Sequence, residues 1–72
     1  MTVKLEIGAL VVDTATDKLG RIRGHVGPYV QLRAPGDGRE WDADPAHLRT
    51  PNEAERERAR VAERPVVTRV TS

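Results

Sequence analysis

The order of apolar and polar residues predicts short β-strands in the first part of the chain. Apolar and charged residues alternate over residues 3–7, and a continuous apolar run over residues 9–12 then leads into Asp13. Alternation is typical of a half-buried strand, whereas a continuous run indicates burial on both faces. We therefore predict a first strand over residues 3–13 that is buried on both faces toward its end, followed by a turn at residues 14–18.

A second strand is predicted over residues 19–24. Gly20, Ile22 and Gly24 alternate along it and therefore share one face. Glycines on both sides of a single inward isoleucine allow a strand to bend sharply. The pattern favours a tightly curled small barrel over a flat sheet.

The strongest local signal is a β-hairpin in the middle of the chain. A turn over residues 24–28, which contains glycine and proline, precedes a strand over residues 29–34. The Pro-Gly-Asp-Gly turn at residues 35–38 and a strand over residues 39–43 complete the hairpin. We expect these two strands to pair in antiparallel order.

The register of this hairpin follows from its apolar residues. Loops of even length pair Trp41 with Leu32 or with Ala34, and both registers place Trp41 on the apolar face. Arg33 then lies on the opposite face with the acidic residues of the last strand. Because Tyr29 lies on that face too, we expect Trp41 to be a core residue and Tyr29 to be the aromatic that contacts a ligand. The alternative makes both aromatics one platform for a peptide or a base.

Two helix-start signals follow the hairpin. One capped helical turn is predicted at residues 44–48, with an aspartate as N-cap and a proline in the first position. Residues 50–53, Thr-Pro-Asn-Glu, match a capping box that opens a helix. This helix is expected to run to about Arg64, because Pro65 stops it.

The predicted helix over residues 51–64 is charged and has only a narrow apolar side. The residues that share this side are Ala54, Val61 and Ala62. Oppositely charged residues spaced three apart support the helix, namely Glu53 with Arg56, Glu55 with Arg58 and Glu57 with Arg60. Because short isolated helices are marginal in water, we expect it to be fully formed only when docked. Residues 66–70 favour extended structure, as an edge strand, a self-association segment or a disordered tail.

These elements predict a mainly β fold, a small SH3-like antiparallel barrel of four or five strands with one C-terminal α-helix. Residues 1–50 are expected to form the barrel, residues 51–64 the charged helix and residues 65–72 an extended or flexible tail. With 72 residues, the chain has room for one domain with a small core.

Composition and charge limit the locations and partners that we expect. The chain has no cysteine, no apolar run long enough to span a bilayer and no export leader, so we expect a cytoplasmic protein that does not bind membranes. Lysine and arginine number 12 against 11 acidic residues, which gives a formal net charge of +1. A domain that grips many phosphates usually shows a clear basic excess. The charge balance therefore does not favour nucleic-acid binding.

The residue patterns indicate neither catalysis nor a metal or cofactor site. His25 and His47 are the only histidines, and neither has a second ligand at zinc-binding spacing. Phosphate-binding fingerprints require a glycine-rich loop that opens a helix after a strand, and the glycines here do not fit that pattern. We therefore predict a non-enzymatic protein with no catalytic residues, no cofactor and no metal.

Our candidate partner-binding residues lie on the tyrosine side of the hairpin and on the preceding strand: Tyr29, Gln31, Arg33, Arg21 and Arg23. The first hypothesis is a module that binds another protein through this surface, the helix or residues 66–70. The second hypothesis is nucleic-acid binding through the arginines and Tyr29. The sequence also leaves a homodimer open.

Three short sequence words are distinctive: Gly-Pro-Tyr at residues 27–29, Gln-Leu-Arg at residues 31–33 and Glu-Trp-Asp at residues 40–42. Together with the Glu- and Arg-rich helix, they resemble a family of short uncharacterised proteins of actinomycetes. More distantly, the run of short strands is similar to SH3-like small barrels of the KOW, Tudor and PRC-barrel type. The second resemblance implies a barrel fold, and neither resemblance implies an activity or site residues.

Overall fold

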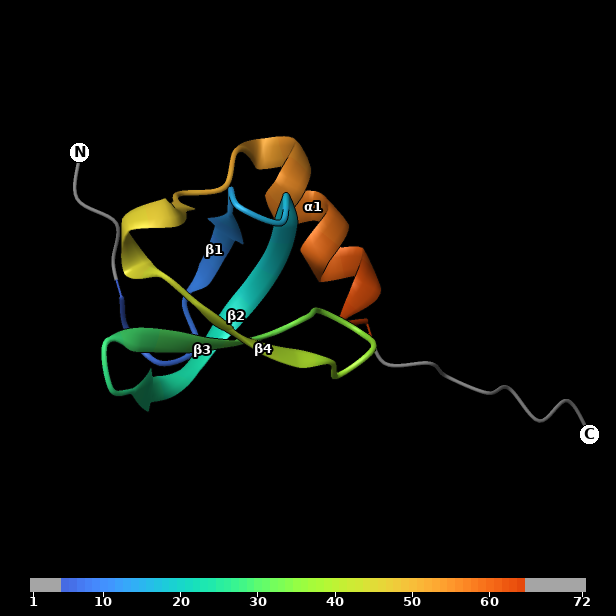
Figure 1. Cartoon of the computed structure of the whole chain (residues 1–72). Helices are drawn as coiled ribbons and strands as arrows, with labels where there is room; N and C mark the ends of the chain where they lie inside the picture. Colours follow the sequence, from blue (N-terminus) through green and yellow to red (C-terminus); the bar gives the residue numbers. More distant parts are fainter. Residues whose placement is uncertain (1–4, 65–72) are drawn as a thin grey trace, which may run out of the picture.

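The computed structural model of this protein describes residues 5–64, which form one antiparallel sheet and a C-terminal helix (Figure 1). The sheet has five strands in the order β4-β3-β2-β1-β5. The strands are β1 (Leu10–Asp13), β2 (Lys18–Val26), β3 (Tyr29–Arg33), β4 (Glu40–Ala43) and β5 (Leu48–Arg49). The helical elements are a short 3₁₀-helix, η1 (Pro45–His47), and α1 (Glu53–Ala62).

The predicted mainly β class, with antiparallel strands and one C-terminal helix, is confirmed. Closure of the sheet into an SH3-like barrel stays a prediction. The extended structure predicted for residues 66–70 falls outside the described residues.

The first strand, β1, is shorter than predicted. Gly8 adopts a left-handed φ of +88°, and the N–H of Ala9 donates to the carbonyl of Glu6 over 2.9 Å, so the preceding residues form a turn. Alternation of residue types does not reveal such a turn, because a glycine also fits the exposed face of a strand. The end of β1 is buried on both faces, as predicted, with exposed fractions of 1%, 2% and 3% for Val11, Val12 and Asp13.

The second strand, β2, is longer than predicted and contains a β-bulge. Its pairing with β3 shifts by one residue between Ile22 and Gly24, so Arg23 has no partner in the ladder. The ladder then resumes and continues to Val26, which makes the turn into β3 shorter than the predicted residues 24–28. A bulge bends a strand and increases its twist. The expected bend therefore occurs, but it does not end the strand.

The β3–β4 hairpin has one of the even registers that the sequence predicts. Leu32 lies opposite Trp41. A loop over residues 35–38 joins the strands, and the N–H of Ala34 closes it by donating to the carbonyl of Arg39 over 2.7 Å. Trp41 therefore lies on the apolar face of the hairpin, as predicted.

The core contains residues from every strand of the sheet. Its buried members are Val11, Ile22, Val30, Leu32, Ala43 and Leu48. Ala43 and Leu48 come from β4 and β5, the first and last strands in the sheet order. The sheet must therefore curl until both edges reach one core. The half-buried Trp41 packs against this cluster, which confirms it as a core-side residue.

The indole of Trp41 extends across the sheet from β4 to β1. A methyl group placed on Gly20 would lie 2.9 Å from Cβ of Leu32 and 3.1 Å from Cη2 of Trp41, so the ring lies directly over this glycine. The indole Nε1 donates to Oδ2 of Asp13 over 2.9 Å, and Oδ1 of the same carboxylate accepts from the N–H of Ala15 over 3.0 Å. The nearly fully buried carboxylate thus has a donor for each oxygen.

Both predicted helix starts are present, but α1 begins later than predicted. In η1, the N-cap is Asp44 and Pro45 opens the helix, as expected. The cap of α1 is Asn52, whose Oδ1 accepts from the N–H of Glu55 over 2.8 Å while the Glu55 carboxylate accepts from the N–H of Asn52 over 2.9 Å. The predicted cap at Thr50 is therefore wrong. Both positions carry a suitable cap and a glutamate three residues later, and contacts of Glu55 with the sheet favour the second.

The buried side of α1 differs from the predicted apolar side. Val61 is 52% exposed, whereas Glu55 and Ala59 are buried. Glu55, Ala59 and Glu63 follow one another at intervals of four residues, which places them on one face of the helix. The helix therefore docks through buried Glu55 and Ala59 and through its exposed cap residue Glu63, whereas apolar residues were expected on this side.

Two arginines of the sheet hold the two ends of this helix face. Nη2 of Arg49 in β5 lies 2.6 Å from the Glu55 carboxylate, and Nε of Arg21 in β2 lies 2.7 Å from the Glu63 carboxylate. Val12, which is paired with Arg49 in the sheet, is buried although it faces away from the core cluster. The helix thus covers the outer face of the sheet along β1. We expected α1 to be fully formed only when docked, and it is docked on the sheet.

Candidate functional site

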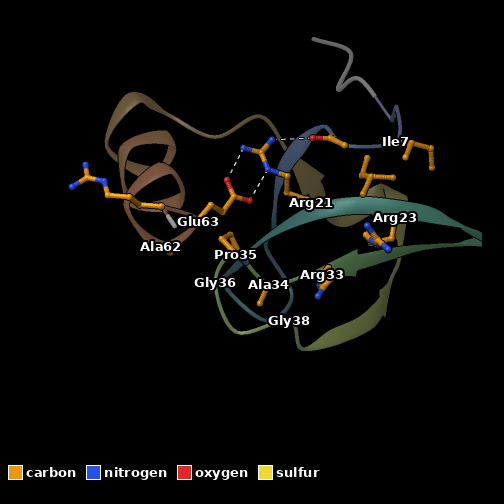
Figure 2. Close-up of a pocket in the computed structure, with 13 residues that line it drawn as sticks. Ile7, Arg21, Arg23, Arg33, Ala34, Pro35, Gly36, Gly38, Ala62 and Glu63 are labelled. Atoms are coloured by element: carbon orange, nitrogen blue, oxygen red, sulfur yellow. Dashed lines mark hydrogen bonds and ion pairs between the residues drawn. The ribbon is translucent and has the colours of Figure 1, made fainter. Parts of the chain in front are cut away.

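A groove of about 450 Å³ lies where the end of α1 approaches the outer face of the sheet (Figure 2). Four arginines line it: Arg21, Arg23, Arg33 and Arg64. We call it the arginine groove. It brings together the three arginines among the predicted partner-binding residues and adds Arg64, which the sequence did not single out.

The strands position these arginines through their register. Arg21 and Arg33 lie directly opposite each other on β2 and β3, so their side chains leave the same face of the sheet. Arg23 is the bulge residue and is set apart from the ladder. Arginines on one face of two neighbouring strands bring positive charge to this part of the sheet.

Arg21 is held by the protein itself. Nε and Nη2 donate to the two oxygens of Glu63 over 2.7 and 2.9 Å, and Nη1 donates to the carbonyl of Gly8 over 2.9 Å (Figure 2). The hydrogen bonds from Arg21 lower the pKa of Glu63, and those to Glu63 raise the pKa of Arg21, each against a smaller opposing effect of burial. Arg21 therefore fixes the end of the helix and forms one wall of the groove.

The other arginines of the groove are more available to a ligand. Nε of Arg23 lies 3.7 Å from the Glu40 carboxylate, a loose pair between exposed groups. Within residues 5–64, the side chains of Arg33 and Arg64 make neither a hydrogen bond nor an ion pair. Gly38 leaves room for Arg33, because a methyl group on this glycine would lie 3.2 Å from its Nη2.

Tyr29 and Gln31 do not reach the arginine groove. Tyr29 lies at the start of β3, opposite Val26, and the two residues are 48% and 50% exposed. Gln31 lies between Gly24 and Asp42 on the neighbouring strands. Tyr29, Gln31 and Arg33 share one face of β3, as predicted. Only Arg33 lines the arginine groove, and Tyr29 lies at the opposite end of the strand.

A second groove, of about 380 Å³, lies on the other side of the loop over residues 35–38. Its apolar lining includes Leu19, Trp41 and Ala59, and its basic residues are Lys18, Arg39 and Arg58. We call it the tryptophan groove. The sequence did not predict it, because it forms only when the helix docks beside the hairpin.

The side chains of both grooves favour the binding of anions. In the part of the chain that the structure describes, no group of three or more His, Cys, Asp or Glu residues could hold a metal ion. Among residues 5–64, no helix combines the length and the apolar character that crossing a membrane would need. His25 and His47 are exposed, and neither lines the arginine groove or the tryptophan groove.

No family model, curated protein or solved structure matches this chain.

Proposed function

We propose that this protein is a non-enzymatic interaction module that binds an acidic segment of a partner protein in the arginine groove. The observation that carries the proposal is the gathering of Arg23, Arg33 and Arg64 around one groove. Among residues 5–64, the one acidic residue that lines it, Glu63, is already bound by Arg21 in a two-pronged ion pair. The groove therefore has an excess of positive charge, although the chain as a whole is nearly neutral.

Carboxylates suit this groove well. A guanidinium group can donate two parallel hydrogen bonds to one carboxylate, and it loses less hydration than a lysine ammonium does on binding. Ile7 and Pro35 add apolar surface beside the arginines, which fits the mixed character of a polypeptide segment. We place this binding in the cytoplasm. The acidic segment belongs to a different protein, and the experiments below must distinguish this partner from a second copy of the same chain.

The surroundings of the groove favour a short peptide over a nucleic-acid strand. Glu40 lies opposite Arg33, and Asp42 lies opposite Gln31, on the open face that continues from the groove. A phosphate backbone running past the arginines along β3 would meet these exposed carboxylates. A short peptide whose acidic residues all lie within the arginine groove does not meet these carboxylates.

Charge reversal in the groove tests the proposal. Arg33→Glu is expected to weaken binding of a synthetic Glu- and Asp-rich peptide by about tenfold or more, since it replaces an attraction with a repulsion. Arg56→Glu is the matched control, because Arg56 is an exposed arginine of α1 that lines neither groove. Calorimetric titration at low salt measures both affinities, and circular dichroism verifies the fold. Equal affinities of the two variants would contradict the proposal.

Partner capture gives an independent measurement. Cross-linking in the native cell, followed by purification of wild-type and Arg33→Glu protein, should recover a partner with an acidic segment only with the wild type. Sedimentation of the purified protein measures self-association. A stable dimer that Arg33→Glu dissociates would assign the acidic segment to a second copy of this chain.

Nucleic-acid binding is the second candidate, and one observation favours it. Four arginines line the arginine groove and three basic residues line the tryptophan groove beside it, against one acidic residue in each. Titration with single- and double-stranded oligonucleotides at several salt concentrations tests this candidate. Affinity that falls steeply with salt, together with no binding of the acidic peptide, would replace the first proposal by the second.

A further inference from the structure

The tryptophan groove has an apolar floor. Trp41 lines it together with Leu19 and Ala59, and its volume of about 380 Å³ lies near the lower end of the range for small-ligand pockets. The indole N–H is already donated to the buried carboxylate of Asp13. The ring therefore offers apolar surface to the groove and no free hydrogen-bond donor.

The two grooves are adjacent and share a wall. Ala34, Pro35 and Ala62 line both of them. At this wall the loop and the helix touch, because a methyl group on Gly36 would lie 2.7 Å from the carbonyl oxygen of Ala62. Gly36 also has a φ of +91°, so a glycine is needed here for both space and conformation. A bound segment needs to cross only this contact to occupy both grooves.

The rim of the tryptophan groove is basic. Within residues 5–64, the side chains of Lys18, Arg39 and Arg58 make neither a hydrogen bond nor an ion pair. The acidic residue of the rim, Asp37, accepts a hydrogen bond from the backbone N–H of Arg39 over 2.8 Å. Apolar lining residues with exposed basic residues beside them are complementary to an apolar group that carries negative charges beside it.

We infer that the tryptophan groove receives a bulky apolar side chain of the same acidic segment that occupies the arginine groove. This inference rests on the proposed function and adds the partner's chemistry, namely an apolar anchor flanked by carboxylates. The anchor packs against Trp41 and Leu19, and the flanking carboxylates face the basic residues of both rims. Burial of the anchor supplies affinity that charge pairs at an exposed surface do not supply alone.

A nucleobase fits this groove less well than an apolar side chain. A base has polar edges that need hydrogen-bond partners when it is removed from water. Leu19, Ala59 and Ala62 have no polar side-chain atoms, and the indole N–H is already used inside the protein. These residues can therefore bury an apolar side chain, but they offer no hydrogen-bond partner to the polar edges of a base.

Two peptides that differ in one residue test the inference on the intact protein. The first is acetyl-Glu-Asp-Phe-Asp-Glu-amide, and the second has alanine in place of phenylalanine. Trp41 is the only tryptophan of the chain, so its fluorescence reports directly on the groove. We expect the phenylalanine peptide to bind about ten times more tightly or better and to change the emission of Trp41. The alanine peptide should bind weakly and leave the emission unchanged.

Charge reversal at the two rims provides the matched variants. Arg58→Glu, at the rim of the tryptophan groove, should weaken binding of the phenylalanine peptide more than Arg56→Glu does. Arg56 lies on the same helix but lines neither groove. Arg33→Glu should weaken binding of both peptides, because it acts on the arginine groove. Denaturant unfolding of each variant verifies that the fold is intact.

Failure of the inference can be told apart from failure of the proposed function. Equal affinity of the two peptides, with Trp41 emission unchanged and both weakened by Arg33→Glu, would overturn the anchor and leave the interaction module standing. No binding of either peptide at low salt would overturn both. Quenching of Trp41 by an oligonucleotide, without peptide binding, would assign the groove to base stacking instead.

Discussion

The inner face of the sheet and its helix-covered outer face bury residues of different kinds. The inner face packs around aliphatic residues such as Ile22 and Leu32, which are both 0% exposed, and the indole of Trp41. Along β1 the outer face is covered by α1, which buries Glu55 and Ala59 there, and Glu55 and the exposed cap residue Glu63 are bound to arginines of the sheet. Apolar packing therefore dominates the inner face, whereas ion pairs attach the helix to the outer face.

This difference has consequences for how each face responds to its surroundings. Salt does not screen apolar burial, which is also nearly insensitive to pH, whereas exposed ion pairs weaken in salt and when a carboxylate becomes protonated. The core should therefore keep its structure under conditions that loosen the helix. Because both grooves are built partly from α1, loosening the helix should also weaken both candidate binding sites.

The largest expected effect is on the inner face, from Gly20→Ala. The added methyl group would lie 2.9 Å from Cβ of Leu32 and 3.1 Å from the indole, in a core that cannot move aside easily. We expect the free energy of unfolding to fall by about 3 kcal/mol, the upper end of typical overpacking costs. Chemical denaturation measures it. Gly24→Ala is the control on the same strand, because a methyl group there meets nothing within 4 Å. Similar losses of stability in both variants would contradict the prediction, because the close contacts at Gly20 would then not determine the cost of the added methyl group.

The second effect concerns the hydrogen bond between Trp41 and Asp13. Trp41→Phe keeps an aromatic ring but removes the N–H that donates to Oδ2 of the buried carboxylate. We expect a loss of about 1–2 kcal/mol in the free energy of unfolding, since one carboxylate oxygen loses its donor. A double-mutant cycle with Asp13→Ala measures the coupling. Strictly additive losses would mean that the hydrogen bond contributes nothing.

The third effect moves to the outer face and tests the start of α1. Asn52→Ala removes the side chain that accepts from the N–H of Glu55, and we expect a loss of about 1 kcal/mol. Thr50→Ala should change stability little, because the Thr50 side chain makes no hydrogen bond within residues 5–64. Denaturation and helix content by circular dichroism measure both variants. A larger loss at Thr50 would restore the cap predicted from the sequence.

The smallest expected effect concerns Glu55 and is a loss of stability that appears only as the pH falls below 4.5. Hydrogen bonds from Arg49, and then from the backbone of Asn52, lower the pKa of Glu55 from 4.5 to about 2. Because the pKa is lower in the folded protein, the ionised carboxylate stabilises the fold fully above pH 4.5. This contribution is lost progressively as the pH falls from 4.5 toward 2.

Unfolding measured across this pH range checks the prediction. Glu55→Gln should remove part of the pH dependence, because its side chain does not titrate. Glu57→Gln is the control, since Glu57 pairs with Arg60 on the exposed side of the same helix. Identical pH profiles for wild type and Glu55→Gln would be the contrary result.

Local sequence patterns were sufficient for much of the sheet. A strand repeats every two residues, so an even loop between Leu32 and Trp41 leaves only one face for the indole. Where the prediction went wrong, a backbone feature interrupted the pattern. Gly8 turns the chain before β1, and the bulge at Arg23 allows β2 to continue past Gly24. The glycines of β2 predicted a bend, but the alternation of residue types did not show that the strand continues past it or that a turn precedes β1.

The candidate site was predictable only in part. Arg21 and Arg33 could be assigned to one sheet face, because both alternate with inward residues. Arg64 and the tryptophan groove could not be assigned, since their positions depend on where the helix docks. The glycines at positions 36 and 38 were a usable signal, because a glycine permits a close approach, and Ala62 lies against Gly36 while Arg33 lies against Gly38.

The sequence by itself determined the β3–β4 hairpin and the face on which Trp41 lies, because these depend on alternation and on a turn between residues near in sequence. It left two registers of that hairpin open and did not fix the bounds of β1 and β2. Only the tertiary structure decided which glutamates of α1 face the sheet. The helix has several glutamates and arginines whose possible pairings look equivalent in the sequence, and Arg21 finds Glu63 across 42 positions. In the folded protein Arg49 pairs with Glu55 and Arg21 pairs with Glu63. These two pairs fix the position of the helix, and both grooves form between the helix and the sheet.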